Sequence, residues 1–183
     1  SAYGRDLQKR FFDFFLKGID NGFDRTPRVQ LNIRRPGERF EWRGEAEWPL
    51  ARTVWTELNL HPDLTLSTAS VAQGVEVSYE ALGDGLLFLT EPFEEETEIT
   101  GPMAARFSIS SSTEDADLFL VVRLFAPDGD EVTFEGSTDP NTPIANGWLR
   151  ASHRALDPER STPWEPFHPH DRVQVLIPGE AYE

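Results

Sequence analysis

The chain has 183 residues, of which 38% are hydrophobic and 27% are charged, and this is the composition of a globular protein rather than a disordered one. Its 17 basic and 32 acidic residues give a formal net charge of −15, which repels phosphate groups, so we expect neither nucleic acid nor an anionic membrane as a partner. It contains no cysteine, which excludes disulfides and thiolate chemistry and fits a cytoplasmic location.

The first segment has the periodicity of an amphipathic helix. Leu7, Phe11, Phe14 and Phe15 recur at helical spacing, and a glycine at position 18 supplies a stop signal. The sequence therefore predicts a helix over residues 5–18. Its apolar face is wider than one small domain needs, so we expect this face to pack against a partner surface.

After Pro27 the pattern changes to short runs of β-forming residues separated by turn residues. The predicted strands are Val29–Ile33, Thr53–Leu60, Leu64–Thr68, Val75–Tyr79, Leu86–Thr90, Ala104–Ser110, Leu118–Phe125, Val132–Phe134, Trp148–Ala151 and Val173–Ile177. The run from Leu118 to Leu124 is almost continuously apolar, which is typical of a central strand covered on both faces. Many short strands and one helix predict a mainly β fold of the sandwich type.

Several motifs, taken in order, resemble those of one hydrolase family. They are residues 11–22 (FFDFFLKGIDNG), 47–50 (EWPL), 97–102 (TEITGP), 110–118 (SSSTEDADL), 147–154 (GWLRASHR) and 176–180 (LIPGE). They resemble the end of the catalytic domain and the C-terminal domain of the CocE/NonD hydrolases, which include cocaine esterase and X-prolyl dipeptidyl-peptidases. The resemblance covers essentially the whole chain.

The resemblance implies a jelly-roll sandwich of the galactose-binding type over residues 27–183. It also implies that residues 1–26 are the terminal helix and linker of an α/β-hydrolase domain. The family's nucleophile, acid and histidine all lie upstream in that domain, so none is carried over to a position here. Family members continue past the segment at 176–180 with further strands. Either this sandwich lacks its last strands, or those strands come from elsewhere. An incomplete sheet would leave an unpaired edge, which is a route to a homo-oligomer.

The adjacent Ser152 and His153 suggest a catalytic dyad, but the spacing argues against it. Neighbouring residues in a strand point to opposite faces, so their side chains are not within hydrogen-bonding reach. The chain also lacks the G-x-S-x-G pattern of a nucleophile elbow. We expect this chain alone to be inactive, with no catalytic residue.

Two groups of polar residues could hold a metal ion. His168, His170 and Asp171 have strand spacing suited to zinc or iron, and the acidic group Glu114, Asp115 and Asp117 could hold calcium. Neither group has a diagnostic spacing, so we predict no metal and no cofactor. The favoured interpretations are a loop packing on the partner domain and a solvated acidic turn.

The sequence thus predicts a non-catalytic accessory domain that packs on an α/β-hydrolase catalytic domain of the same protein and shapes its substrate entrance. The residues expected at the domain interface or in a structural role are Phe11, Phe14, Phe15, Trp55, Trp148, Arg150, His153 and Arg154. The alternative is a free-standing carbohydrate-binding module, in which the tryptophans at 42, 48, 55, 148 and 164 form a sugar-stacking platform.

Overall fold

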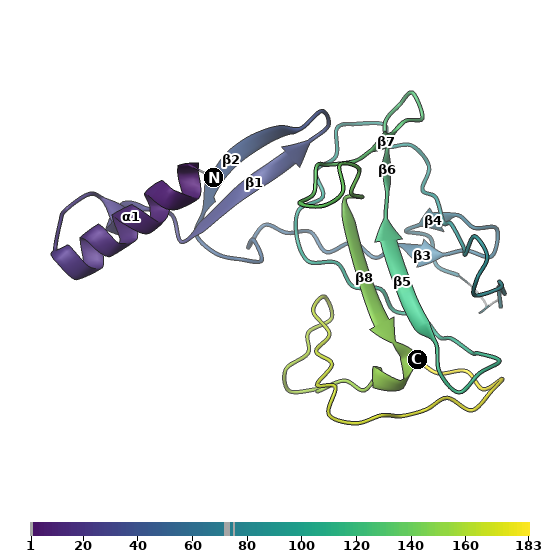
Figure 1. Cartoon of the computed structure of the whole chain (residues 1–183). Coiled ribbons are helices and arrows are strands. Elements are labelled where there is room, and N and C mark those ends of the chain that lie inside the picture. The colour runs from purple at the N-terminus through teal and green to yellow at the C-terminus, as the bar shows by residue number, and fades with distance from the viewer. Residues whose placement is uncertain (1, 72–73, 75) are drawn as a thin grey trace. The chain divides into compact units, whose positions relative to one another are not determined.

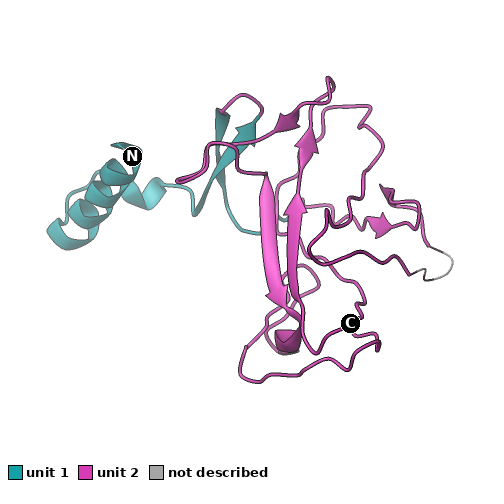
Figure 2. Cartoon of the chain, turned by 45° about the vertical axis from the view of Figure 1, so that its right-hand side comes forward, with its two compact units in different colours: residues 1–35, 39–51 teal, residues 36–38, 52–183 magenta. Residues whose placement is uncertain are grey.

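The computed structural model describes residues 2–71, 74 and 76–183. The elements, in chain order, are α1 (Ala2–Lys17), η1 (Phe23–Arg25), β1 (Val29–Arg35), β2 (Arg39–Glu45), β3 (Asn59–Leu60), β4 (Leu66–Ser67), β5 (Asp117–Val122), β6 (Leu124–Phe125), β7 (Glu131–Val132), β8 (Ala145–Arg150) and η2 (Ala151–His153) (Figure 1). They form two compact units, residues 1–35 with 39–51 and residues 36–38 with 52–183 (Figure 2). The fold is mainly β with one N-terminal helix, as the sequence predicts.

Helix α1 confirms the predicted helix but begins earlier, at Ala2. The carboxylate of Asp13 lies 2.6 Å from Lys9 Nζ and 2.7 Å from Lys17 Nζ, so a cation one turn away on each side supports the helix. The helix ends where Gly18 takes a left-handed conformation with φ 64°. On another face of α1, Phe11, Phe14 and Phe15 form a cluster of aromatic rings with Phe23 of η1.

Strands β1 and β2 form an antiparallel hairpin whose register runs from Val29 opposite Glu45 to Arg35 opposite Arg39. Strand β1 is predicted by the sequence, whereas β2 is not. Alternate residues of β2 are charged, and the positions between them hold Phe40, Trp42 and Gly44. This strict alternation is the signal that could have identified the strand.

In the second unit the chain pairs as β3 with β4, β5 with β8 and β6 with β7, all antiparallel. Several predicted strands shrink to short pairs or single bridges. The run Thr53–Leu60 contributes only Asn59–Leu60, and Leu86–Thr90 contributes a bridge at Leu89. Val75 lies outside the described residues, and Glu76 to Tyr79 form no strand.

The C-terminal run Val173–Ile177 was predicted as a strand and is not one, yet its backbone is held by hydrogen bonds. The N–H of Gln174 donates to Ser152 O at 2.7 Å, and the N–H of Leu176 donates to Glu114 O at 2.7 Å. Further along, Tyr182 and Ile109 form an antiparallel bridge. These bonds go to different segments, so no continuous ladder forms, although the end of the chain is fixed.

The prediction that Leu118–Leu124 is covered on both faces is wrong for the described residues. Strand β5 pairs with β8 alone among them, and the side chain of Phe119 is 73% exposed. A continuous apolar run indicates that both faces are suited to burial, but it does not say which chain covers them.

The buried apolar side chains of the described residues divide between the units. Ile33 and Leu50 lie in the first unit, and the second holds Val132, Phe134, Ala151 and Leu176. No helix in the part of the chain that the structure describes is both long and apolar enough to cross a bilayer.

Candidate functional site

The hydroxyl of Ser152 is bonded to a carboxylate rather than to a histidine. Ser152 is 1% exposed, and its Oγ–H donates to Asp115 Oδ2 at 2.6 Å while its N–H donates to Asp115 Oδ1 at 2.9 Å. The side chain of His153, the next residue, instead faces His170. In this geometry Ser152 ties the end of β8 to the turn that precedes β5.

The same contacts set the protonation of Asp115. Burial by itself raises the pKa of this carboxyl, but hydrogen bonds from the Ser152 hydroxyl, from the Ser152 N–H and from the Ala116 N–H lower it more. The pKa of Asp115 therefore lies below its ordinary value, and the group is an anion at neutral pH. This residue was singled out only as a calcium candidate, because its partner is 37 positions away in the sequence.

The other residues of the acidic turn are also engaged by groups of this chain. Both carboxylate oxygens of Asp117 accept hydrogen bonds from Arg150, at 2.7 and 2.9 Å, across the β5–β8 pair. Glu114 offers its carbonyl to Leu176. Among the described residues no group of three or more His, Asp or Glu side chains is placed to hold a metal ion.

Arg154 fixes the C-terminal segment. Its Nη1 donates to Ala151 O at 3.1 Å and also to Gln174 O, and its guanidinium lies over the ring of Tyr182, 4.4 Å from the centroid. Together with the buried Ser152, this arginine binds the end of the chain to the segment after β8. Of the predicted structural residues, Arg150 and Arg154 thus have defined partners within the second unit.

The histidines do not adopt the predicted strand spacing, because His170 takes a left-handed conformation with φ 54°. His168 Nδ1 lies 3.1 Å from Arg154 O and 3.3 Å from Ala155 O, so this nitrogen carries the proton and donates. The ring of His170 instead meets His153, with the two Nδ1 atoms 3.3 Å apart.

The tryptophans do not form a single row. Trp55 and Trp164 stack with centroids 4.3 Å apart and planes at 16°, so each ring covers one face of the other. Trp42 contacts Tyr3 edge-on in the first unit. Trp148 stands directly opposite Phe119 in the β5–β8 pair, and the two side chains are 74% and 73% exposed.

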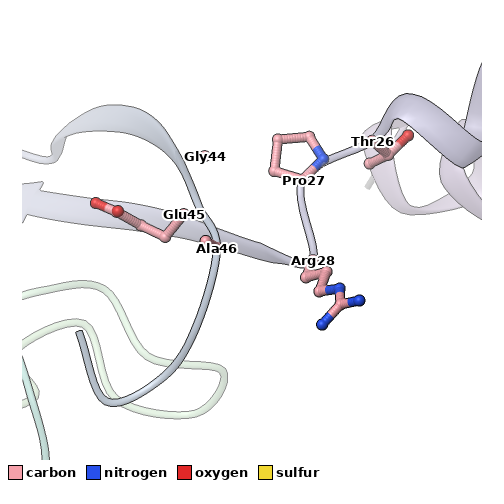
Figure 3. Close-up of a pocket in the computed structure, with 6 residues that line it drawn as sticks. All are labelled: Thr26, Pro27, Arg28, Gly44, Glu45 and Ala46. Carbon is pink, nitrogen blue, oxygen red and sulfur yellow. The ribbon is translucent and has the colours of Figure 1, made fainter. Parts of the chain in front are cut away.

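A shallow depression of about 460 Å³ in the first unit is lined by Thr26, Pro27, Arg28, Gly44, Glu45 and Ala46. In Figure 3 the charged ends of Arg28 and Glu45 point away from each other, so the polar groups do not converge on a ligand position. The lining includes Gly44 because Pro27 lies close to its backbone, and a Cβ at position 44 would lie 2.6 Å from Pro27 Cγ. The depression therefore reflects close packing of the hairpin rather than a binding site.

Two groups of exposed aromatic side chains stand out among the described residues. One is the aromatic face of α1, where Phe11 is 41% and Phe15 is 59% exposed, with Phe14 half-buried beside them. The other is the β5–β8 face with Phe119 and Trp148. Each surface belongs to a different unit.

Comparison with known proteins agrees with a non-catalytic role. Residues 21–183 match the family described as the X-Pro dipeptidyl-peptidase C-terminal non-catalytic domain. This chain belongs to that family. It is also 25% identical over 162 residues to the cocaine esterase of Rhodococcus sp. (strain MB1 Bresler), a match that covers 67% of this chain and 28% of the esterase.

Solved structures extend the similarity to the first twenty residues. Two crystal structures of a CocE/NonD family hydrolase from Staphylococcus aureus match all of this chain at 28% identity, with TM-scores of 0.88 and 0.87. The chain spans 34% of that hydrolase. This domain is thus a C-terminal domain of the CocE/NonD family, and its antiparallel strands are consistent with a β-sandwich.

Proposed function

We propose that this chain is the accessory domain of an α/β-hydrolase, where it packs on the catalytic domain of the same protein and narrows the entrance to its active site. The observation that carries the proposal is the exposed aromatic face of α1. An apolar patch of this kind on a small domain marks an interaction surface. In addition, the match covers 28% of the cocaine esterase, and such relatives have ample further chain to cover the patch.

The limits of the family match support a division of the chain near residue 26. The match begins at residue 21, so α1 lies entirely before it. We propose that residues 1–26 are the terminal helix and linker of the catalytic domain and that residues 27–183 are the sandwich, with jelly-roll topology. In this proposal the aromatic face of α1 contacts the rest of the catalytic domain, so it supports attachment of this chain to that domain, and the contact made by the sandwich itself is the β5–β8 face.

The β5–β8 face is the second candidate contact surface. Phe119 and Trp148 provide a large exposed aromatic pair, and the Asp117–Arg150 ion pair lies next to it in the register of the two strands. An aromatic centre bordered by charged groups is the usual composition of an interface. We propose that Trp148 is the anchor residue of this surface.

The reaction of the whole protein would be acyl transfer to water through a serine acyl-enzyme, on an ester or an X-Pro peptide. The names of the family and of the Rhodococcus relative support this class of substrate. The present chain contributes no group to the chemical step in this proposal, since the hydroxyl of Ser152 is bonded to Asp115.

The proposal is tested in the full-length protein with the variants Phe15→Glu and Trp148→Glu. Leu82→Glu is the control, because Leu82 is fully exposed and belongs to neither surface. We expect both test variants to lower the midpoint of thermal unfolding and to reduce the preference for small over bulky p-nitrophenyl esters. If they match the control in both measurements, these surfaces neither pack on the catalytic domain nor shape its entrance.

The carbohydrate-binding alternative has less support in the geometry. A sugar platform needs free aromatic faces, and Trp55 and Trp164 each use one face on the other. Binding of soluble oligosaccharides that is lost in Trp55→Ala would favour this alternative over the accessory role.

A further inference from the structure

His153 and His170 are held close together by two separate segments of the second unit. Their Nδ1 atoms are 3.3 Å apart and their ring centroids 5.3 Å apart. His153 ends η2, and His170 lies in the long loop that follows, drawn in yellow-green to yellow in Figure 1. His170 is exposed and His153 half-buried, so the gap between the nitrogens is accessible from solvent.

The separation of the two nitrogens fits a shared metal ion. Zinc binds imidazole nitrogen at 2.0–2.1 Å in tetrahedral geometry, and two such ligands lie about 3.3 Å apart. The same separation also fits a long N–H···N hydrogen bond between the two rings. The distance therefore admits either a proton or a metal ion between the nitrogens, and the zinc titration below decides between them.

The surrounding bonds hold both imidazoles in place. On one side the backbone of Ser152, next to His153, is bonded to Asp115 and to Gln174. On the other side His168 donates from Nδ1 to the carbonyls of Arg154 and Ala155, which fixes the segment that carries His170. Ligands fixed in this way lose little conformational freedom when they bind a metal.

The loop between the two histidines is closed on itself. Asp157 N–H donates to Phe167 O at 3.0 Å, and Thr162 and Glu165 form an isolated bridge. The guanidinium of Arg160 also lies over the ring of Phe167, 3.4 Å from the centroid. His170 follows this closed loop in a left-handed conformation, and strained conformations of non-glycine residues are frequent at ligand sites.

We propose that His153 and His170 form a binding site for a divalent transition-metal ion that prefers tetrahedral coordination, such as zinc. The described residues provide no group of three or more metal-binding side chains, so two imidazoles are the protein ligands and water fills the remaining positions. The net charge of −15 attracts cations to the chain. The ion holds the loop that carries His170 against the segment after β8, independently of any role in hydrolysis.

Zinc titration of the 183-residue chain by calorimetry tests the site, in excess calcium so that surface carboxylates are occupied. The test variants are His153→Gln and His170→Asn, since asparagine tolerates the left-handed backbone. The matched control is His61→Gln. His61 is the one histidine of the chain outside residues 153–170, and its Nε2 is bonded to Ser67 Oγ at 2.9 Å.

We expect one zinc ion per chain, with binding at least about tenfold weaker in each test variant and unchanged in the control. Cobalt bound in place of zinc should show the intense visible absorption of a tetrahedral ion, and this absorption should disappear in the same two variants. The proposal is overturned if the parent chain binds no zinc. It is also overturned if the two test variants bind as tightly as the parent, or if the control loses binding equally.

Discussion

Ser152 and Asp115 tie distant segments of the second unit together. The carboxylate accepts two hydrogen bonds from Ser152 and one from the N–H of Ala116. By contrast, the Asp117–Arg150 pair beside it has side chains 48% and 57% exposed, and such pairs contribute little to stability. Burial rather than formal charge therefore decides which of the two interactions matters.

We predict that Ser152→Ala lowers the free energy of unfolding by about 1–3 kcal/mol, because it removes a buried donor to a charged acceptor. Urea denaturation measures this change. Thr97→Ala is the control, since the exposed Thr97 hydroxyl bonds to the nearby Glu95 carbonyl, and we expect it to change stability by less than about 0.5 kcal/mol. Equal stabilities for the two variants would contradict the structural role of Ser152.

The pKa of Asp115 predicts a pH dependence. Because the folded-state pKa lies below the unfolded value, the contribution of this group is present above the unfolded pKa of about 3.9 and is lost as the pH falls through the folded pKa. Asp115→Asn should therefore be less stable than the parent at neutral pH, and the difference should shrink under acidic conditions. Urea midpoints measured from pH 7 to pH 2 check this, and a constant difference would contradict it.

At the scale of elements, the sequence predicts those whose signal is local. The spacing of Phe11, Phe14 and Phe15 predicts α1, and the apolar run from Leu118 predicts β5. Strand β2 was missed because four of its seven residues are charged, so it does not read as a run of β-forming residues although its alternation is strict. The run Val173–Ile177 was predicted as a strand and is not one. Its backbone hydrogen bonds go to Ser152 and Glu114, which lie in different segments, and local sequence does not reveal these partners.

Two strand glycines give a matched pair for testing the packing of these elements. A Cβ at Gly44 of β2 would lie 2.6 Å from Pro27 Cγ, whereas one at Gly147 of β8 would meet no atom within 4 Å. We predict that Gly44→Ala lowers the free energy of unfolding by about 1–3 kcal/mol. Gly147→Ala should be neutral or stabilising by up to about 1 kcal/mol, since glycine weakens a strand interior.

Thermal or urea unfolding of the two alanine variants distinguishes the sites. A loss of stability in Gly147→Ala equal to that in Gly44→Ala would mean that backbone freedom, and not the contact with Pro27, determines the effect.

At the scale of the whole molecule, the sequence motifs were sufficient to identify the family, which the match over residues 21–183 shows. They were not sufficient to locate the contacts of the candidate site. The pairing of Ser152 with Asp115 and that of His153 with His170 join residues 37 and 17 positions apart. Such contacts follow from how loops return to the sheet, and loop paths are not encoded in local periodicity.

The exposed aromatic surfaces are the feature that connects this chain to the rest of the proposed hydrolase. Hydroxyl-radical footprinting with mass spectrometry measures the solvent exposure of individual side chains, and it can be applied to both the 183-residue chain and the full-length protein. We predict that oxidation of Phe15 and Trp148 is several-fold lower in the full-length protein, while oxidation of Leu82 is the same in both. Equal oxidation of Phe15 and Trp148 in the two proteins would contradict the proposed packing on a catalytic domain.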